Sequence, residues 1–276
     1  MPEEREHVGI IAGGGTFPML VADAAKRRGC LTVAVAHEGE TDPALEEHVD
    51  ELVWVRLGQL GRLIRAFRRR GVRRVMMAGT IAKRRMFSRL RPDLKGLAVM
   101  SRMAVFHDDG ILRNVSREME KEGILVIPST HFLPELMAPP GVLTRRKPTK
   151  DEVSDIRFGW RMAKELGRLD IGQCVVVRSK TVIALEAMEG TDETIRRGGR
   201  IAGEKAVVVK VSKPSQDLRF DVPSVGPVTI SIMKEVKASV LTVEAGKTLL
   251  FEMPAMIRLA DEAGIAVVSM DYGERI

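Results

Sequence analysis

The densest group of chemically capable side chains in this 276-residue chain lies between residues 213 and 226. Asp217, Arg219 and Asp221 occupy alternate positions, and an extended segment would place all three on one face. Carboxylate oxygens are ligands that Mg²⁺ prefers, and a guanidinium can fork onto phosphate oxygens. We therefore predict that Asp217 and Asp221 bind Mg²⁺, and that Lys213 and Arg219 bind a phosphorylated substrate.

A competing interpretation treats this segment as a solvated strand face crossed by ion pairs, because alternating charge is common on protein surfaces. Pro214 and Pro223 bracket the segment, and they favour a fixed loop over an ordinary edge strand. The sequence leaves both interpretations open.

A second polar group surrounds a predicted hairpin of strands 173–178 and 181–185. Residues that precede the first strand and residues that follow the second strand should converge, because a hairpin brings its two ends together. We assign this group to substrate binding, together with one amide of the first run: Asp170, Gln173, Glu189, Thr191, Asp192 and Gln216.

A glycine-rich turn at residues 12–18 joins a predicted strand, 7–12, to a predicted helix, 19–28. Backbone N–H groups in such a turn can approach a phosphate, although the run lacks the spacing of a dinucleotide fingerprint or a P-loop. A bare tight turn is the alternative. The residues assigned to phosphate or sugar binding here, and after the predicted strand 75–78, are Gly13, Gly14, Gly15, Thr16, Phe17, Gly79 and Lys83.

The elements that position the first of these turns alternate between strand and helix. Further strands are expected at 31–36, 52–56 and 124–127, and helices at 59–70 and 109–122. Alternation of this kind predicts a Rossmann-like, mainly parallel sheet that binds ligands at the carboxyl ends of its strands.

Prolines punctuate the chain between residues 134 and 148, and the pattern then changes. A helix at 150–166 precedes the hairpin, and further strands are expected at 206–210, 228–230 and 248–251. We predict an α/β protein with a Rossmann-like domain at 1–135, a linker at 136–149 and a smaller mixed α/β domain at 150–276.

Charge is unevenly distributed, with 44 Lys+Arg against 37 Asp+Glu overall, and 17 basic against 3 acidic residues between Arg56 and Arg117. A basic stretch attracts nucleic acid, an anionic membrane or a phosphorylated substrate. The scarcity of aromatic residues argues against a base-stacking platform, so we expect no nucleic-acid partner. Adaptation of the surface to heat is an equally weighted explanation of these arginines.

Several classes of protein and site are excluded or unsupported. Cys30 and Cys174 cannot form a disulfide framework, the five histidines lack zinc-site spacing, and no serine stands in a GxSxG setting. The apolar runs are too short to span a bilayer, and residues 1–11 do not have the layout of a signal peptide. We therefore expect a cytoplasmic protein.

Four motifs in this order resemble the LpxI family of UDP-2,3-diacylglucosamine pyrophosphatases, and the likeness runs through nearly the whole chain. The first motif is weakly specific, whereas the last three together are strong. They are IIAGGGTFP at 10–18, GRLDIGQ at 167–173, EAMEGTD at 186–192 and KPSQDLRFDVPSVG at 213–226.

The resemblance implies a Mg²⁺-dependent enzyme of lipid A synthesis that hydrolyses UDP-2,3-diacylglucosamine to UMP and 2,3-diacylglucosamine 1-phosphate (lipid X). It also implies that the substrate lies between two domains and that Asp221 is the critical catalytic carboxylate. A non-catalytic module that binds a nucleotide sugar or lipid in the same cleft is the alternative.

A lipid-linked substrate agrees with a peripheral position at the inner face of the cytoplasmic membrane, where the basic stretch would meet anionic lipids. Phe87, Leu90, Leu97 and Met100 lie among basic residues and are assigned to an acyl-binding or membrane-facing surface, with simple core packing as the alternative. The sequence leaves a homo-oligomer open.

Overall fold

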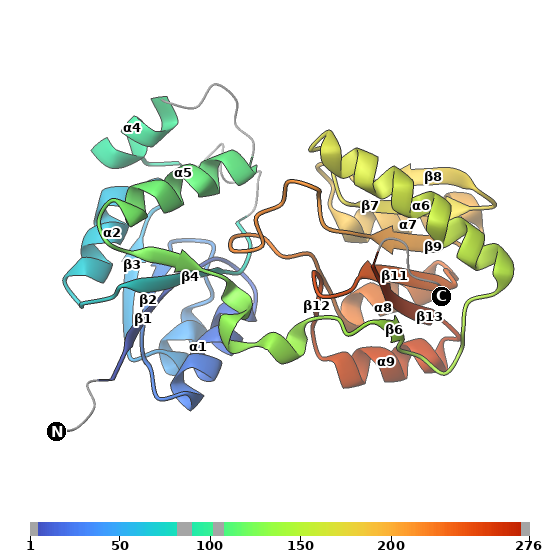
Figure 1. Ribbon diagram of the computed structural model, residues 1–276, viewed down its shortest axis with the longest axis horizontal. Coiled ribbons are helices and arrows are strands. Elements are labelled where there is room, and N and C mark those ends of the chain that lie inside the picture. Colours follow the sequence, from blue (N-terminus) through green and yellow to red (C-terminus); the bar gives the residue numbers. More distant parts are fainter. Residues whose placement is uncertain (1–4, 82–89, 102–107, 272–276) are drawn as a thin grey trace. The chain divides into compact units, whose positions relative to one another are not determined.

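The computed structural model describes residues 5–81, 90–101 and 108–271 (Figure 1). The chain divides into two compact units, which are described separately. Unit 1 comprises Met1–Pro134 together with Asp217–Asp221, and unit 2 comprises Glu135–Gln216 and Val222–Ile276. The motif at 213–226 is therefore divided between the units, which a single linear boundary could not anticipate.

Unit 1 is built on a five-stranded parallel sheet in the order β3-β2-β1-β4-β5, which confirms the predicted Rossmann-like fold. Its strands are β1 (His7–Ala12), β2 (Leu31–His37), β3 (Glu51–Val55), β4 (Arg74–Ala78) and β5 (Leu125–Ile127). The described helices of this unit are α1 (Phe17–Arg27), α2 (Leu60–Arg68), α4 (Leu94–Ser101) and α5 (Asp108–Glu120), with the 3-10 turns η1 (Pro43–His48) and η2 (Ser129–Phe132).

The central strands of this sheet are nearly continuous apolar runs, as expected where helices cover both faces. Helix α2 turns Ile64 and Phe67 toward the sheet, where they pack in one buried cluster with Val75 and Met119. Phe220, which is distant in sequence, belongs to the same cluster. Burial of this aromatic ring explains why the segment 217–221 belongs to unit 1.

Unit 2 contains a mixed six-stranded sheet in the order β6-β13-β11-β9-β7-β8, which confirms the predicted mixed α/β class. Strands β9 (Val207–Lys210), β11 (Val240–Glu244) and β13 (Ala266–Met270) run parallel. Strand β6 (Gly141–Val142) pairs antiparallel with β13, and β7 (Cys174–Arg178) pairs antiparallel with both β9 and β8 (Thr181–Leu185). A separate parallel pair joins β10 (Ser224–Val225) to β12 (Leu249–Leu250).

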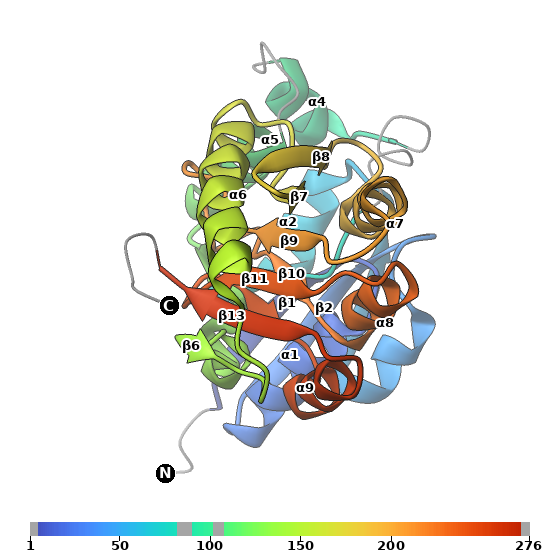
Figure 2. The same ribbon diagram turned by 90° about the vertical axis from the view of Figure 1, so that its right-hand side faces the viewer.

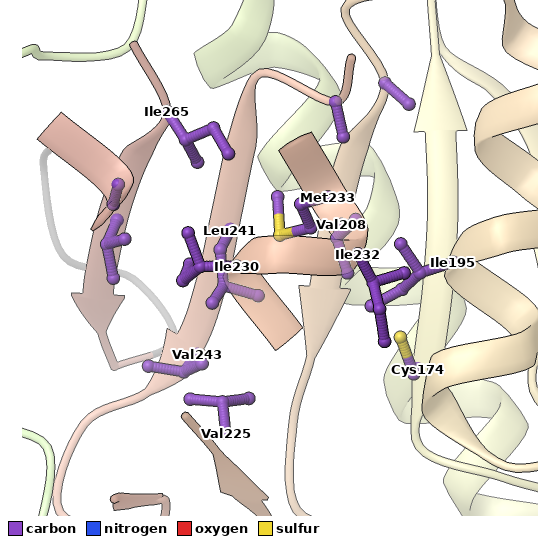
Figure 3. Close-up of a cluster of buried hydrophobic side chains, with 14 of the residues drawn as sticks. Cys174, Ile195, Val208, Val225, Ile230, Ile232, Met233, Leu241, Val243 and Ile265 are labelled. Carbon is purple, nitrogen blue, oxygen red and sulfur yellow. The ribbon is translucent and has the colours of Figure 1, made fainter. Parts of the chain in front are cut away.

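Helices cover both faces of this sheet (Figure 2). Helix α6 (Lys150–Arg168) covers one face, and its first turn is fixed by a capping box between Thr149 and Glu152. The opposite face carries α7 (Thr191–Ala202), α8 (Pro227–Glu235) and α9 (Met253–Glu262). Figure 3 shows the core beneath them, where side chains of α8 meet those of β11 and β9.

Two expectations about this half of the chain need correction. Residues 228–230 lie in α8 rather than in a strand, because Pro227 starts a helix that buries Ile230 and Met233. Residues 136–149 are not a linker, since Ala138 is buried and β6 pairs with β13. The 3-10 turn η3 (Pro134–Leu136) lies at the start of unit 2. Unit 2 is nearly as long as unit 1, so the predicted difference in domain size is small.

Strands β11 and β13 and helices α7 and α9 were not anticipated, although the first two are fully buried runs. Within the described ranges, no helix has the length and apolar character required to cross a membrane.

Candidate functional site

The glycine-rich turn of unit 1 follows β1 and contacts the end of β4. Gly13 N–H donates to the carbonyl of Ala78 at 2.8 Å, and Gly14 exchanges backbone hydrogen bonds with Thr80 at 2.7 and 3.1 Å. A Cβ added to Gly13 would lie 2.7 Å from the Thr80 carbonyl oxygen, and one on Gly79 would lie 2.5 Å from that of Gly14. These three glycines allow two loops to touch, and the amides of Gly13 and Gly14 are already used.

The remaining part of the turn is open to solvent. Gly15 and Thr16 are exposed, and Gly15 has a φ of 84°, which favours glycine. Thr16 caps α1 without a side-chain hydrogen bond, and Phe17 is half-buried. A ligand of this turn would therefore meet the start of α1. Lys83 lies outside the described residues.

The same edge of the sheet holds a buried histidine. The Nδ1 atom of His37 lies 3.0 Å from the Ala12 carbonyl oxygen, which also accepts a hydrogen bond from the Thr41 hydroxyl at 2.7 Å. Burial lowers the pKa of His37, so its imidazole is neutral at pH 7. His37 and Thr41 therefore link the end of β2 to the end of β1.

In unit 2, an ion pair orients the lysine of the long motif. Lys213 Nζ lies 2.5 Å from an Asp170 carboxylate oxygen, and the lysine side chain is only 10% exposed. The backbone N–H of Lys213 donates to Gln216 Oε1 at 2.8 Å. Gly167 of α6 permits this packing, because a Cβ there would lie 3.0 Å from the Lys213 Cα atom. The structure thus brings Asp170, Lys213 and Gln216 together.

The hairpin residues gather around a carboxylate that the sequence reasoning did not single out. Glu186 is 7% exposed and accepts hydrogen bonds from Gln173 N–H at 3.1 Å and from the Thr191 hydroxyl at 2.8 Å. Within the described part of the chain, no donor reaches the buried Oε1 atom of Gln173. The sequence feature that could have identified Glu186 is its position at the start of the EAMEGTD motif.

The other acidic residues of this group lie at the start of α7. Glu189 accepts hydrogen bonds from Arg197 at 2.6 Å and from the Thr194 hydroxyl at 3.3 Å. Hydrogen bonds to its carboxylate, from backbone amides and from Arg197, hold the pKa of Glu189 below its usual value. Asp192 is half-buried in the first turn of α7. Glu189 therefore helps to fix this helix.

The segment 217–221 of unit 1 is a turn, which agrees with the fixed loop that the bracketing prolines favour and differs from the solvated strand face of the competing interpretation. The Asp217 carbonyl accepts hydrogen bonds from the backbone N–H groups of Phe220 at 3.0 Å and Asp221 at 3.3 Å. Asp217 also accepts a fork from Arg219, with Nε 3.0 Å from Oδ1 and Nη2 2.7 Å from Oδ2. Pairing of these neighbours closes the turn and removes the common face that alternate positions would share.

Arg219 has further contacts that hold it in the turn. Its Nη1 atom lies 3.5 Å from a Glu120 carboxylate oxygen, and the guanidinium lies 4.8 Å from the centre of the Phe220 ring. The hydrogen bond from Arg219 lowers the pKa of Asp217, and Asp217 raises that of Arg219. Phe220 is buried, whereas Asp221 is exposed at the end of the turn. The turn therefore presents the Asp221 carboxylate to its surroundings.

The donor set limits how Mg²⁺ could bind. The described residues contain no group of three or more histidine, cysteine, aspartate or glutamate side chains suited to a metal. Asp217 would have to exchange its Arg219 contacts for the ion, whereas Asp221 is exposed. Mg²⁺ commonly uses one or two carboxylates plus substrate phosphates. The residues fit a shared site of that kind and do not fit a cage made by the protein alone.

The proposed apolar surface is only partly described. On α4, Val99 is buried in the core, whereas Leu94 is 86% and Leu97 50% exposed. Leu90 and Met100 are half-buried, and Phe87 lies outside the described residues. Leu97 and its neighbour Leu94 are thus not accounted for by core packing.

Comparison with known proteins gives matches to both halves of the chain. Residues 7–136 match the family described as the LpxI N-terminal domain, and residues 139–268 match the LpxI C-terminal domain. UDP-2,3-diacylglucosamine pyrophosphatase LpxI of Caulobacter vibrioides is 34% identical over 279 residues, covering 97% of this chain and 99% of that protein.

Solved structures give much weaker matches. A biotin carboxylase complex from Campylobacter jejuni is 11% identical with a TM-score of 0.31, covering 72% of this chain and 42% of the other. N5-carboxyaminoimidazole ribonucleotide synthetase from Thermotoga maritima is 17% identical with a TM-score of 0.27, covering 67% and 43%. Likeness at this level carries no argument about site or function.

Proposed function

We propose a specific reaction for this chain, which belongs to the LpxI family and is a UDP-2,3-diacylglucosamine pyrophosphatase of lipid A synthesis. Water adds to one phosphorus of the substrate diphosphate and the bridging P–O bond breaks. The products are UMP and 2,3-diacylglucosamine 1-phosphate. The observation that carries this proposal is the turn at 217–221, which holds an exposed carboxylate, Asp221, beside an anchored aromatic ring and a closed ion pair.

Asp221 is the catalytic residue of this proposal, as a metal ligand or as the general base for the attacking water. Either role needs a carboxylate at a fixed place. The Asp217–Arg219 fork and the buried Phe220 supply that fixed place, because they close the turn immediately before Asp221. These contacts support the assignment.

Mg²⁺ would be held by Asp221 together with oxygens of the substrate diphosphate. When bound, the ion neutralises charge on those oxygens and makes the phosphorus easier to attack. Asp217 contributes chiefly by holding Arg219, whose guanidinium also faces Glu120.

Lys213 is assigned to the substrate diphosphate from the other side of the motif. An ammonium group has three N–H donors, so Lys213 can donate to phosphate oxygens as well as to Asp170. Because Lys213 belongs to unit 2 and Asp221 to unit 1, we infer that one substrate molecule is contacted by residues of both units. The exposed start of α1 at Gly15 and Thr16 is assigned to the nucleotide or sugar part, and the hairpin group around Gln173 and Thr191 to further polar contacts.

The diacyl part of the substrate needs apolar surface. The exposed leucines of α4, Leu94 and Leu97, support contact between this helix and acyl chains or the membrane in which the substrate resides. Arginine residues of the basic stretch would add attraction to anionic lipids.

The test is incubation of the purified protein with UDP-2,3-diacylglucosamine and Mg²⁺, followed by mass spectrometry. We expect the protein to form many equivalents of UMP and 2,3-diacylglucosamine 1-phosphate. The Asp221→Asn variant should form only traces of either product. Binding of the substrate without turnover would instead indicate a non-catalytic nucleotide-sugar or lipid-binding protein.

A further inference from the structure

Glu244 is a buried carboxylate at the end of β11 in unit 2, with an exposure of 1%. Its Oε2 atom accepts hydrogen bonds from Lys164 Nζ at 2.7 Å, Ser212 N–H at 2.9 Å and the Ser212 hydroxyl at 2.7 Å. Its Oε1 atom accepts one from Lys247 Nζ at 2.8 Å. None of these residues was assigned a role by the sequence motifs.

This arrangement keeps the carboxylate ionised. Burial acts to raise the pKa of Glu244, but the donors from Lys164, Lys247 and Ser212 outweigh it and hold the pKa below its usual value. A buried ion pair is often no more stabilising than a well-packed apolar group of similar size. Stability alone therefore gives little reason for a buried charge at this position. The contacts of Glu244 indicate a further role.

Those contacts converge on the residue that precedes Lys213. Glu244 accepts both the backbone and the hydroxyl donor of Ser212, and Lys164 donates to the Ser212 carbonyl at 2.9 Å. That carbonyl belongs to the peptide group that joins Ser212 to Lys213. The Lys213 N–H is in turn bonded to Gln216. The backbone on the N-terminal side of Lys213 is thus fixed by one carboxylate and its partner lysine.

We propose that Glu244, through Ser212 and with Lys164, is a positioning residue for Lys213, so that it sets the affinity of the enzyme for the substrate diphosphate. This inference rests on the proposed function, in which Lys213 contacts that diphosphate. Asp170 orients the ammonium end of Lys213, and Glu244 orients its backbone end. Loss of either support lets the ammonium move away from the place where the phosphate binds.

A double-mutant cycle tests the proposal, with Glu244→Gln, Lys213→Met and the combined variant. If Glu244 acts through Lys213, Glu244→Gln raises KM for UDP-2,3-diacylglucosamine by about tenfold and changes kcat by less than about threefold. In the Lys213→Met background, the same change has no further effect on KM. An equal rise in KM with and without Lys213 would overturn the proposal, and so would a normal KM in Glu244→Gln.

A matched control removes another buried carboxylate of unit 2. Asp155 accepts the backbone N–H groups of Ser179 at 2.8 Å and Lys180 at 2.6 Å, at the turn between β7 and β8. Asp155→Asn should lower the melting temperature as a buried-carboxylate change does, while KM stays normal. A rise in KM equal to that of Glu244→Gln would show a general effect of loosening unit 2 and would overturn the positioning role.

Ser212→Ala provides a milder variant in case Glu244→Gln does not fold. It removes one donor to Glu244 and keeps the backbone contact, so KM should rise by about two- to fivefold, again only when Lys213 is present. An unchanged KM in Ser212→Ala would reject the proposal. Absence of turnover by the unchanged protein would reject the proposed function, and the positioning role with it.

Discussion

The two halves of the motif at 213–226 are held in place by different physical means. Residues 213–216 of unit 2 follow Ser212, which is held by hydrogen bonds to the buried Glu244 carboxylate; Lys164 pairs with the same carboxylate. Residues 217–221 of unit 1 are supported by a buried aromatic ring, Phe220, and by a partly exposed fork between Arg219 and Asp217. The first arrangement positions a cation, and the second positions an anion.

The difference shows how a continuous motif can serve two units. A buried network loses much stability when one member is removed, because it leaves an unpaired charge. A partly exposed pair is screened by water and contributes little by itself, so the turn at 217–221 depends on its apolar anchor. Substitutions in the two halves of the motif should therefore differ in how much they reduce stability and activity.

Among substitutions, the largest effect is expected for Asp221→Asn. The change keeps the size of the side chain and removes its charge, so kcat should fall by roughly 10² to 10⁴-fold while substrate still binds. The melting temperature should stay near that of the unchanged protein, because Asp221 is exposed. Melting temperature, substrate affinity and kcat measured on one preparation check this, and a stable, fully active variant would contradict the assignment.

Removal of Mg²⁺ sharpens the role of Asp221. Excess EDTA should abolish turnover of the unchanged protein, and added Mg²⁺ should restore it. If Asp221 is a metal ligand, Asp221→Asn should also need a higher Mg²⁺ concentration for half-maximal rate, whereas a general base would leave that concentration unchanged. Full activity in EDTA would remove the metal from the reaction.

Phe220→Ala tests the apolar anchor of unit 1. Truncation of a buried aromatic side chain costs about 3–5 kcal/mol, so unit 1 should unfold at lower denaturant concentration. Turnover should fall as well, because the turn before Asp221 loses its anchor. Leu218→Ala in the same turn is the control, since Leu218 is only half-buried. Equal unfolding midpoints for the two variants would show that Phe220 is not the anchor.

Arg219→Lys should have a smaller effect. The charge remains, but an ammonium group cannot reproduce the fork onto Asp217 or the stacking on Phe220. We expect a KM raised, or a kcat lowered, by about threefold to tenfold. Unchanged kinetics would show that Arg219 is only a member of a surface ion pair.

The smallest effect concerns acid pH. Because the pKa of Asp217 is lowered in the folded protein, its pair with Arg219 contributes stability above the ordinary aspartate pKa of about 3.9 and loses it as pH falls further. The difference in melting temperature between pH 7 and about pH 3 should therefore be smaller in Asp217→Asn than in the unchanged protein. Equal differences would show that the pair contributes nothing measurable.

Local pattern was sufficient for much of this protein. Alternating apolar strands and helices identified the parallel sheet of unit 1, because a strand buried on both faces must be apolar along its whole length. The four motifs identified the family, since they are read directly as residue types in order. The polar residues at the hairpin were also found from position, because a hairpin brings its own ends together.

Other features depended on contacts between residues far apart in sequence. The β-branched run at 228–230 indicated a strand, but Pro227 and burial against β11 favoured helix α8. The prolines around the motif favoured a fixed loop, but the burial of Phe220 in the core of unit 1, which anchors that loop, was not expected. The residues against which Phe220 packs lie far away in the sequence, so the local sequence does not reveal this contact.

The sequence by itself determined the strands of the first sheet, the family and the residue types available for chemistry, because these follow from local periodicity and residue order. Only the tertiary structure decided the environment of each carboxylate. Asp217 is paired with Arg219, Asp221 is exposed, and Glu244 is buried and hydrogen-bonded to Ser212. Those differences arise from burial and from pairing, which is local for Asp217 and long-range for Glu244, and a carboxylate has the same letter in the sequence whichever environment it occupies.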